Sequence, residues 1–193
     1  MKASKLQIKF FLQANGSSVE LEPFVPVFHG WIRNNLLGEL LIDVADYAHV
    51  VGGPGVVLIG HGSDYFLDLS EGRPGLLYTR KREAPPGLPE LLEDAFARSL
   101  RACQLLEQDK SLPHPVRFRT DELLVRIPDR LHAPNTPETF ERFRPELERA
   151  LGKLMPGVEA GLEPHGSPQH LFGVRVSLPD APGVDTLLGR LTA

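Results

Sequence analysis

The stretch "LIDVADYAHVVGGPGVVLIGHGSDYFLDLSEGRPGLLYTRKR", residues 41–82, decides the fold class. It contains four runs rich in apolar, β-branched or aromatic residues, and clusters of glycine, proline and serine separate them. Strands joined by such short turns form antiparallel hairpins, because parallel strands need a long crossover connection. The first run also matches a helical stripe, but the β-branched run "VVLIG" directly after "VGGPG" favours a hairpin. The stretch therefore predicts a meander of about four strands.

One strand and one helix are predicted before this meander, and one helix is predicted after it. Residues 5–13 alternate between apolar and polar side chains, which is typical of a half-buried strand. Residues 22–37 predict a short helix whose interior Pro26 and Gly30 weaken. Residues 88–108 form the clearest helix, because apolar residues recur there at spacings of three and four. We expect this apolar stripe to be buried against the sheet; it consists of Leu91, Leu92, Ala95, Phe96, Leu100 and Cys103.

The C-terminal part of the chain predicts similar elements. Residues 116–128 indicate a strand or a hairpin that turns near Asp121, and a long helix follows with Asn135 or Thr136 as its cap. Pro145 lies inside this helix and should kink it or split it. Two strands and a terminal helix complete the chain. We therefore predict an α+β fold with a largely antiparallel sheet and with helices packed on one face.

The chain divides into two halves, residues 1–112 and 113–193, which we expect to pack together as one compact unit. Each half reads as a strand, a helix, two or more strands and a helix. The two sequences do not visibly match, so whether the halves are structural repeats stays open at this point.

Composition and charge exclude several classes of protein. The formal net charge is -4, so long-range attraction to nucleic acid is not expected. No stretch approaches the ~20 apolar residues that a membrane span needs. Gln7 and Lys9 interrupt the apolar N-terminus, which argues against a cleaved signal peptide. Cys103 is the only cysteine, which excludes an internal disulfide and a thiolate zinc cluster. We expect a soluble cytoplasmic protein without a cofactor.

The turn "GHGSDY", residues 60–65, combines a histidine, a hydroxyl and a carboxylate. If Gly62 and Ser63 form a two-residue loop, glycine takes the position that needs a positive φ, and His61 stands opposite Asp64. This arrangement predicts that Gly62→Val destabilises the fold and that Ser63→Ala is nearly silent. The turn lacks the glycine–x–serine–x–glycine elbow of serine hydrolases. We interpret His61 and Asp64 either as a structural pair or as an acid/base pair.

A metal site is a weaker interpretation of the same region. Asp43, Asp46, His49, His61 and Asp64 all lie within 22 residues of one another. On a strand, however, Asp43 and His49 share one face while Asp46 points to the other, which divides the set. No standard spacing of metal ligands is present, so we predict that the protein needs no metal to fold.

The segments "LLIDVADYAHVVGGPGVVLIGHGSDYFLD" and "GRPGLLYTRKR" resemble a family of uncharacterised bacterial proteins of about this length. The resemblance covers roughly residues 5–82, which is less than half of the chain. It implies that the meander is the distinctive part of the family, and it transfers no catalytic residue.

The sequence contains no strong catalytic constellation, which favours a binding, regulatory or assembly role for the meander, residues 43–82. Its partner would be another protein or a small-molecule ligand. The alternative is an enzyme that acts on a small anionic substrate, with His61 and Asp64 as the acid/base pair and Arg73 or Arg80 holding the anion. A third hypothesis is a homo-oligomer that associates through a sheet edge. The candidate binding residues are His49, His61, Asp64, Tyr65, Arg73 and Arg80.

Overall fold

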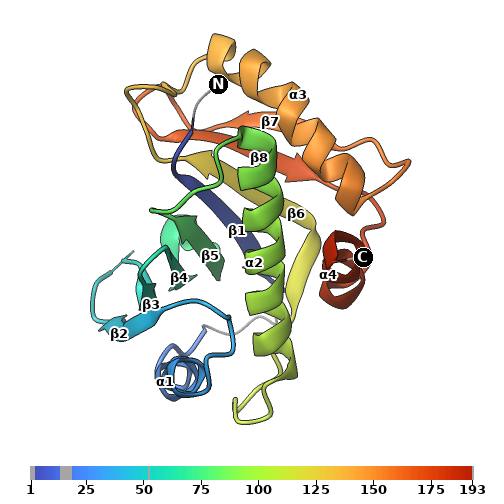
Figure 1. Cartoon of the computed structure of the whole chain (residues 1–193). Coiled ribbons are helices and arrows are strands. Elements are labelled where there is room, and N and C mark those ends of the chain that lie inside the picture. Colours follow the sequence, from blue (N-terminus) through green and yellow to red (C-terminus); the bar gives the residue numbers. More distant parts are fainter. Residues whose placement is uncertain (1–2, 14–18, 52, 193) are drawn as a thin grey trace.

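The computed structural model describes residues 3–13, 19–51 and 53–192. In these residues eight strands form one antiparallel sheet, and four α-helices cover it (Figure 1). The strands are β1 (Leu6–Leu12), β2 (Leu41–Tyr47), β3 (Gly55–Gly60), β4 (Ser63–Asp68), β5 (Gly75–Arg80), β6 (Phe118–Ile127), β7 (Gly161–His165) and β8 (Phe172–Ser177). The helices are α1 (Phe24–Asn34), α2 (Leu88–Gln108), α3 (Pro137–Leu154) and α4 (Val184–Thr192), and a 3₁₀ turn, η1 (Ser70–Gly72), precedes β5.

The strand order is β2-β3-β4-β5-β1-β6-β8-β7, and every neighbouring pair is antiparallel. This order confirms the predicted α+β class and the meander from β2 to β5. Gly52, in the predicted connection between β2 and β3, lies outside the described residues. β1 lies in the middle of the sheet, where Ile8 faces Tyr78 of β5 on one side and Val125 of β6 on the other. No helix of the described residues is long and apolar enough to cross a membrane.

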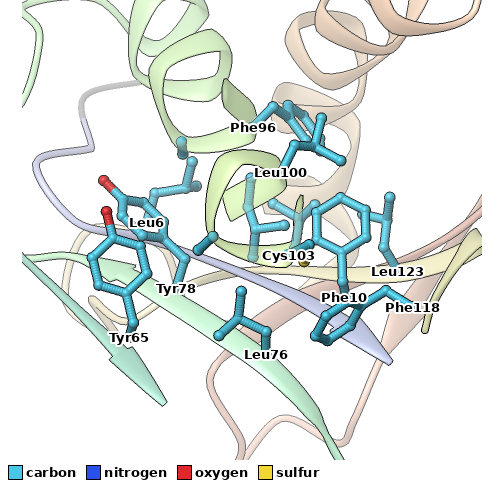
Figure 2. Close-up of a cluster of buried hydrophobic side chains, with 14 of the residues drawn as sticks. Leu6, Phe10, Tyr65, Leu76, Tyr78, Phe96, Leu100, Cys103, Phe118 and Leu123 are labelled. Atoms are coloured by element: carbon cyan, nitrogen blue, oxygen red, sulfur yellow. The ribbon is translucent and has the colours of Figure 1, made fainter. Parts of the chain in front are cut away.

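The core lies between the sheet and the helices. β1 directs Leu6, Ile8 and Phe10 to this side, and all three are fully buried. α2 crosses the middle of the sheet, as Figure 1 shows, and contacts β1 and β5. The predicted apolar stripe of α2 has no exposed surface, which confirms its burial. Figure 2 shows Leu100 and Cys103 of this stripe above the side chains of the strands.

The structure decides between alternatives that the sequence left open in the C-terminal half. β6 is one strand of 10 residues, which confirms the strand rather than the hairpin near Asp121, and β1 and β8 pair with it on both sides. α3 continues through Pro145 as one helix of 18 residues. Phe143 and Leu147, on either side of the proline, are both fully buried, so packing against the core supports the helix across Pro145. Thr136 caps the helix as predicted, with its side chain accepting from the amide of Thr139.

The order of elements repeats between the two halves. The second half runs β6, α3, β7, β8, α4, and the first half runs β1, α1, then β4, β5, α2 with the hairpin β2–β3 inserted after α1. β1 and β6 are antiparallel neighbours at the centre of the sheet. β5 and β4 flank β1 as β8 and β7 flank β6. The extra hairpin therefore distinguishes the two halves, and its strand β2 forms one edge of the sheet.

Candidate functional site

Exposed apolar side chains gather around the edge strand β2. Among the described residues, six of the seven exposed large apolar side chains lie between positions 36 and 51. Leu40 is 67% exposed and Ile42 57% exposed. An apolar surface of this kind marks an interaction site more often than scattered single residues do. We call this surface the β2 patch; it consists of Leu36, Leu40, Ile42, Tyr47, Val50 and Val51.

The local structure of β2 explains the exposure. β2 pairs with β3 on one side only, and the register shifts between Leu41 and Asp43, so that Ile42 is the extra residue of a bulge. Leu41 and Val44 pack against the core. The hairpin therefore holds β2 firmly on its inner side and leaves the outer side uncovered. The opposite edge strand, β7, is shorter and contains Pro164, which has no amide to offer to a further strand.

The backbone of β2 offers hydrogen-bonding groups to the outside. His61, directly after β3, donates its amide to the carbonyl oxygen of Leu40 at 2.8 Å. Backbone groups along a strand alternate between the two neighbours, so Leu58, three residues earlier, directs its groups toward β4. Val44, which pairs with Leu58, therefore directs its amide away from β3. That outward amide donates to Oδ1 of Asp43 at 2.8 Å.

Two carboxylates of β2 accompany the β2 patch, and the segment around them contains no lysine or arginine. No lysine or arginine occurs between Arg33 and Arg73, although six carboxylates do. Four of these carboxylates form ion pairs with cations from other segments; they are Glu39, Asp64, Asp68 and Glu71. Asp43 and Asp46, both exposed on β2, form no ion pair among the described residues. β2 therefore carries two exposed carboxylates beside the apolar β2 patch.

A buried polar cluster anchors the segment that leads into β2. Both carboxylate oxygens of Glu39 accept hydrogen bonds: Oε2 from Ser63 Oγ at 2.5 Å, and Oε1 from the hydroxyl of Tyr65. Arg98 of α2 donates to the same Oε1 at 3.3 Å and to Asp94 at 2.8 Å. Burial, and then the nearby charge of Glu39, raise the pKa of Tyr65 far above its ordinary value. Glu39 is thus held against α2, which fixes the start of β2.

Tyr78 and Arg80 extend this cluster into the core. Arg80 is buried and pairs with Asp94, but its Nε has no hydrogen-bond partner in the part of the chain that the structure describes. The Tyr78 hydroxyl also lacks a hydrogen-bond partner there. Burial raises the pKa of Tyr78, and the nearby Ser63 hydroxyl opposes this rise. The hydroxyls of Tyr65 and Tyr78 point to the same side of the apolar cluster (Figure 2). These groups form a structural network rather than a free acid or base.

A cleft of about 510 Å³ lies beside this network, between α2, α4 and the segment before β2. Arg98 and Asp94 in its wall are already paired with each other. The cleft contains Tyr65 but not His61, Asp64, Arg73 or Arg80, so the residues of the enzyme hypothesis do not meet in it. Its lining residues are Leu37, Gly38, Tyr65, Asp94, Ala97, Arg98, Arg101 and Leu188.

The predicted geometry of the "GHGSDY" hairpin is wrong by one residue. β3 ends at Gly60 and β4 begins at Ser63, so the loop is His61 and Gly62. Asp64 stands opposite Ile59 rather than His61. Gly62 is absent from the described glycines with a positive φ, so the predicted reason for a glycine there also fails.

Contacts with distant segments fix this loop. The carbonyl oxygen of Gly62 accepts from the amides of Lys81 and Arg82, at 2.9 and 3.1 Å. The side chains of the predicted pair separate accordingly. His61 lies 3.4 Å from a carboxylate oxygen of Glu83, and Asp64 accepts from the Lys81 ammonium at 2.7 Å.

The other predicted binding residues occupy different places. Arg73 lies on the face of the sheet opposite to the helices, where its guanidinium is 3.7 Å from the ring centroid of Phe11. It donates two hydrogen bonds to Glu122, at 2.6 and 2.9 Å, and this hydrogen bonding to Arg73 holds the pKa of Glu122 below its ordinary value. Arg80 and Tyr65 belong to the buried cluster on the helix side. His49 is exposed in the turn after β2, within the segment of the β2 patch.

Ser63→Ala is expected to lower the free energy of unfolding by about 1.5–3 kcal/mol, because Ser63 donates to a buried carboxylate. The side chain is fully buried and lies 2.5 Å from Glu39 Oε2. Urea denaturation measures the loss, and Ser177→Ala, at an exposed position of β8, is the control. A loss below about 0.5 kcal/mol would contradict this and would agree with the expectation from sequence that Ser63→Ala is nearly silent.

Comparison with known proteins does not assign this chain to a family. Neither a scan against protein-family models nor a search of curated proteins finds a match to this chain. Within residues 3–13, 19–51 and 53–192, no three histidine, cysteine, aspartate or glutamate side chains are placed to hold a metal ion. Function must therefore be inferred from the surface of the chain itself.

Proposed function

We propose that this protein is a binding or assembly module that accepts a strand of a partner protein along β2. One observation carries the proposal: exposed apolar side chains concentrate around a strand whose outer backbone groups have no partner strand among residues 3–13, 19–51 and 53–192. Addition of a strand to a sheet edge is a common mode of recognition, in which backbone hydrogen bonds give affinity and side-chain contacts give specificity. A partner strand would also cover Leu40, Ile42 and Tyr47.

The difference between the two sheet edges supports this function. Native proteins protect their edge strands with proline, shortness or charge, because an open edge pairs with other chains. β7 has five residues and contains Pro164, whereas β2 has seven residues and contains no proline. β2 also belongs to the hairpin that the second half lacks. A cytoplasmic location is part of the same proposal, since the single cysteine, Cys103, is buried and free.

The enzyme hypothesis has less support. His61 and Asp64 pair with different partners, Glu83 and Lys81. Arg73 and Arg80 lie on opposite faces of the sheet, and each is engaged by a carboxylate. An acid/base pair and an anion-binding cation must reach the same substrate atoms, and these four side chains do not surround one cleft.

The test uses Val44→Pro, which removes the outward amide of β2. Proline is tolerated on an edge strand where the amide faces solvent, so we expect the fold to be retained. The probes are labelled peptides of about eight residues, rich in valine and threonine and of either charge. We expect peptide binding, seen as shifts of the β2 amide resonances in NMR spectra, to weaken about tenfold in Val44→Pro.

Ala45→Pro is the matched control, because the amide of this neighbouring residue faces β3 and its loss should unfold the hairpin. Two results would refute the proposed function. In one, no peptide of either charge shifts the β2 resonances. In the other, Val44→Pro binds the peptides as tightly as the unchanged protein.

A further inference from the structure

The β2 edge indicates the chemistry of its partner. Building on the proposed strand addition, we infer that the partner is an extended protein segment with two basic residues three positions apart, and that Asp43 closes the edge to other segments. The inference depends on the two unpaired carboxylates, Asp43 and Asp46, on the outward amide of Val44, and on the exposed apolar side chains around them.

The spacing follows from the register of β2. Asp43 pairs with Ile59 and Asp46 with Val56, so the two carboxylates lie on opposite faces of the strand. A strand paired with β2 places one residue directly opposite each aspartate, and these two residues are also three positions apart. Opposite charges at directly paired positions stabilise a sheet, whereas like charges there destabilise it. Lysine or arginine is therefore the favoured side chain at both positions.

Asp43 also controls access to the backbone. Its Oδ1 accepts from the Val44 amide at 2.8 Å, and this amide is a donor that an added strand needs. A partner strand without a cation opposite Asp43 would find the Val44 amide already hydrogen-bonded. It would also leave the Asp43 carboxylate without an opposite charge. A cation opposite Asp43 attracts the carboxylate away and frees the amide for the carbonyl oxygen of the partner. Residues of the partner between its two cations then cover Val44 and Ala45.

A second copy of this chain is a poor occupant of the same edge. The 34–72 segment supplies no lysine or arginine. Antiparallel pairing of β2 with β2 of another copy would bring Asp43 and Asp46 of both chains onto adjacent strands without a cation. The carboxylates therefore protect the edge against self-pairing, which is a known use of charge on edge strands.

The experiment compares three peptides of about eight residues built from valine and threonine. The first carries two lysines three positions apart. The second has the same composition, but its lysines are two positions apart and lie on one face of the strand. The third has glutamine in place of both lysines of the first. Each is titrated into the full chain and into three variants: Asp43→Ala, Asp46→Ala, and Glu141→Ala, which removes an exposed carboxylate of α3 as the control.

We expect the unchanged protein and Glu141→Ala to bind the first peptide about fivefold more tightly than the second and about tenfold more tightly than the third. Asp46→Ala should abolish the preference for the first peptide over the second. Asp43→Ala should weaken binding of the first peptide and strengthen binding of the third, because the Val44 amide is then free. Hydrogen exchange of that amide should also accelerate in Asp43→Ala without any peptide.

The outcomes separate the two claims. Equal binding of all three peptides, with loss in Val44→Pro, would support strand addition and overturn the basic partner. No binding of any peptide would overturn strand addition itself. A concentration-dependent dimer of the unchanged protein that Val44→Pro abolishes would show that a second copy occupies the edge, and it would refute the role of Asp43.

Discussion

Replacement of Phe96 by alanine is expected to lower the free energy of unfolding by about 3–5 kcal/mol. Phe96 lies in the middle of α2, has no exposed surface and belongs to the cluster that joins the helix to the sheet (Figure 2). Truncation removes the transfer free energy of the ring and leaves a cavity that the surrounding side chains cannot fill. Chemical denaturation followed by circular dichroism measures the change.

Leu131→Ala is the matched control for the truncation of Phe96. Leu131 is 84% exposed, so loss of its side chain creates no cavity and should change stability by less than about 0.5 kcal/mol. A loss below about 1 kcal/mol for Phe96→Ala would mean that α2 is peripheral to the core rather than its centre.

Asp68→Leu is expected to lower the free energy of unfolding by a similar amount, about 3–5 kcal/mol, because it leaves a buried cation without its partner. Lys9 is 2% exposed, and its Nζ lies 2.5 Å from Oδ2 of Asp68. Burial already lowers the pKa of Lys9, an effect that Asp68 opposes. Without the carboxylate, that pKa should fall further.

The double variant Lys9→Met with Asp68→Leu provides the control, because it replaces the whole pair by apolar side chains. It should recover at least half of the loss in the free energy of unfolding.

The stability of Asp68→Leu should depend on pH with a definite sign. In Asp68→Leu the unfolded chain binds more protons than the native one between the lowered pKa of Lys9 and the ordinary lysine pKa of 10.5, so the free energy of unfolding should rise with pH in that window. Denaturation of Asp68→Leu at about pH 7 and about pH 9.5 tests this, and a constant or growing deficit would contradict it.

Local patterns were sufficient to predict most of the elements. The apolar stripe of α2 extends over 21 residues, and a long amphipathic period specifies both the helix and its buried face. The turn clusters between residues 41 and 82 specify a meander, because antiparallel hairpins need only short connections. The same turn clusters favour a strand over a helix for β2, and the structure confirms the strand.

The failures of prediction lie where distant contacts decide. The hairpin after β3 is fixed by the hydrogen bonds that the carbonyl oxygen of Gly62 accepts from the amides of Lys81 and Arg82. The local sequence "GHGSDY" gives no information about these distant residues. The choice between a strand and a hairpin for β6, which the sequence left open, is decided by β1 and β8, which pair with it on both sides. Pro145 does not divide α3, because Phe143 and Leu147 on either side of it are buried in the core.

Only part of the candidate site could be predicted from the sequence. His49 lies in the segment of the β2 patch, but the other five candidate residues are engaged in separate pairs or buried clusters. Exposure of Leu40 and Ile42 depends on the edge position of β2, which strand order alone decides. The absence of lysine and arginine between Arg33 and Arg73 is visible in the sequence and is a signal that could indicate this surface.

The proline in β7 limits how large a complex this sheet can form. Fibre growth by strand addition requires two receptive ends on every subunit, so that each newcomer offers a further end. Here Pro164 terminates the sheet at β7, while β2 remains available. If a partner occupies β2 as proposed, the described part of the chain offers no second receptive sheet edge. The expected product is a discrete one-to-one complex of fixed stoichiometry, not a polymer.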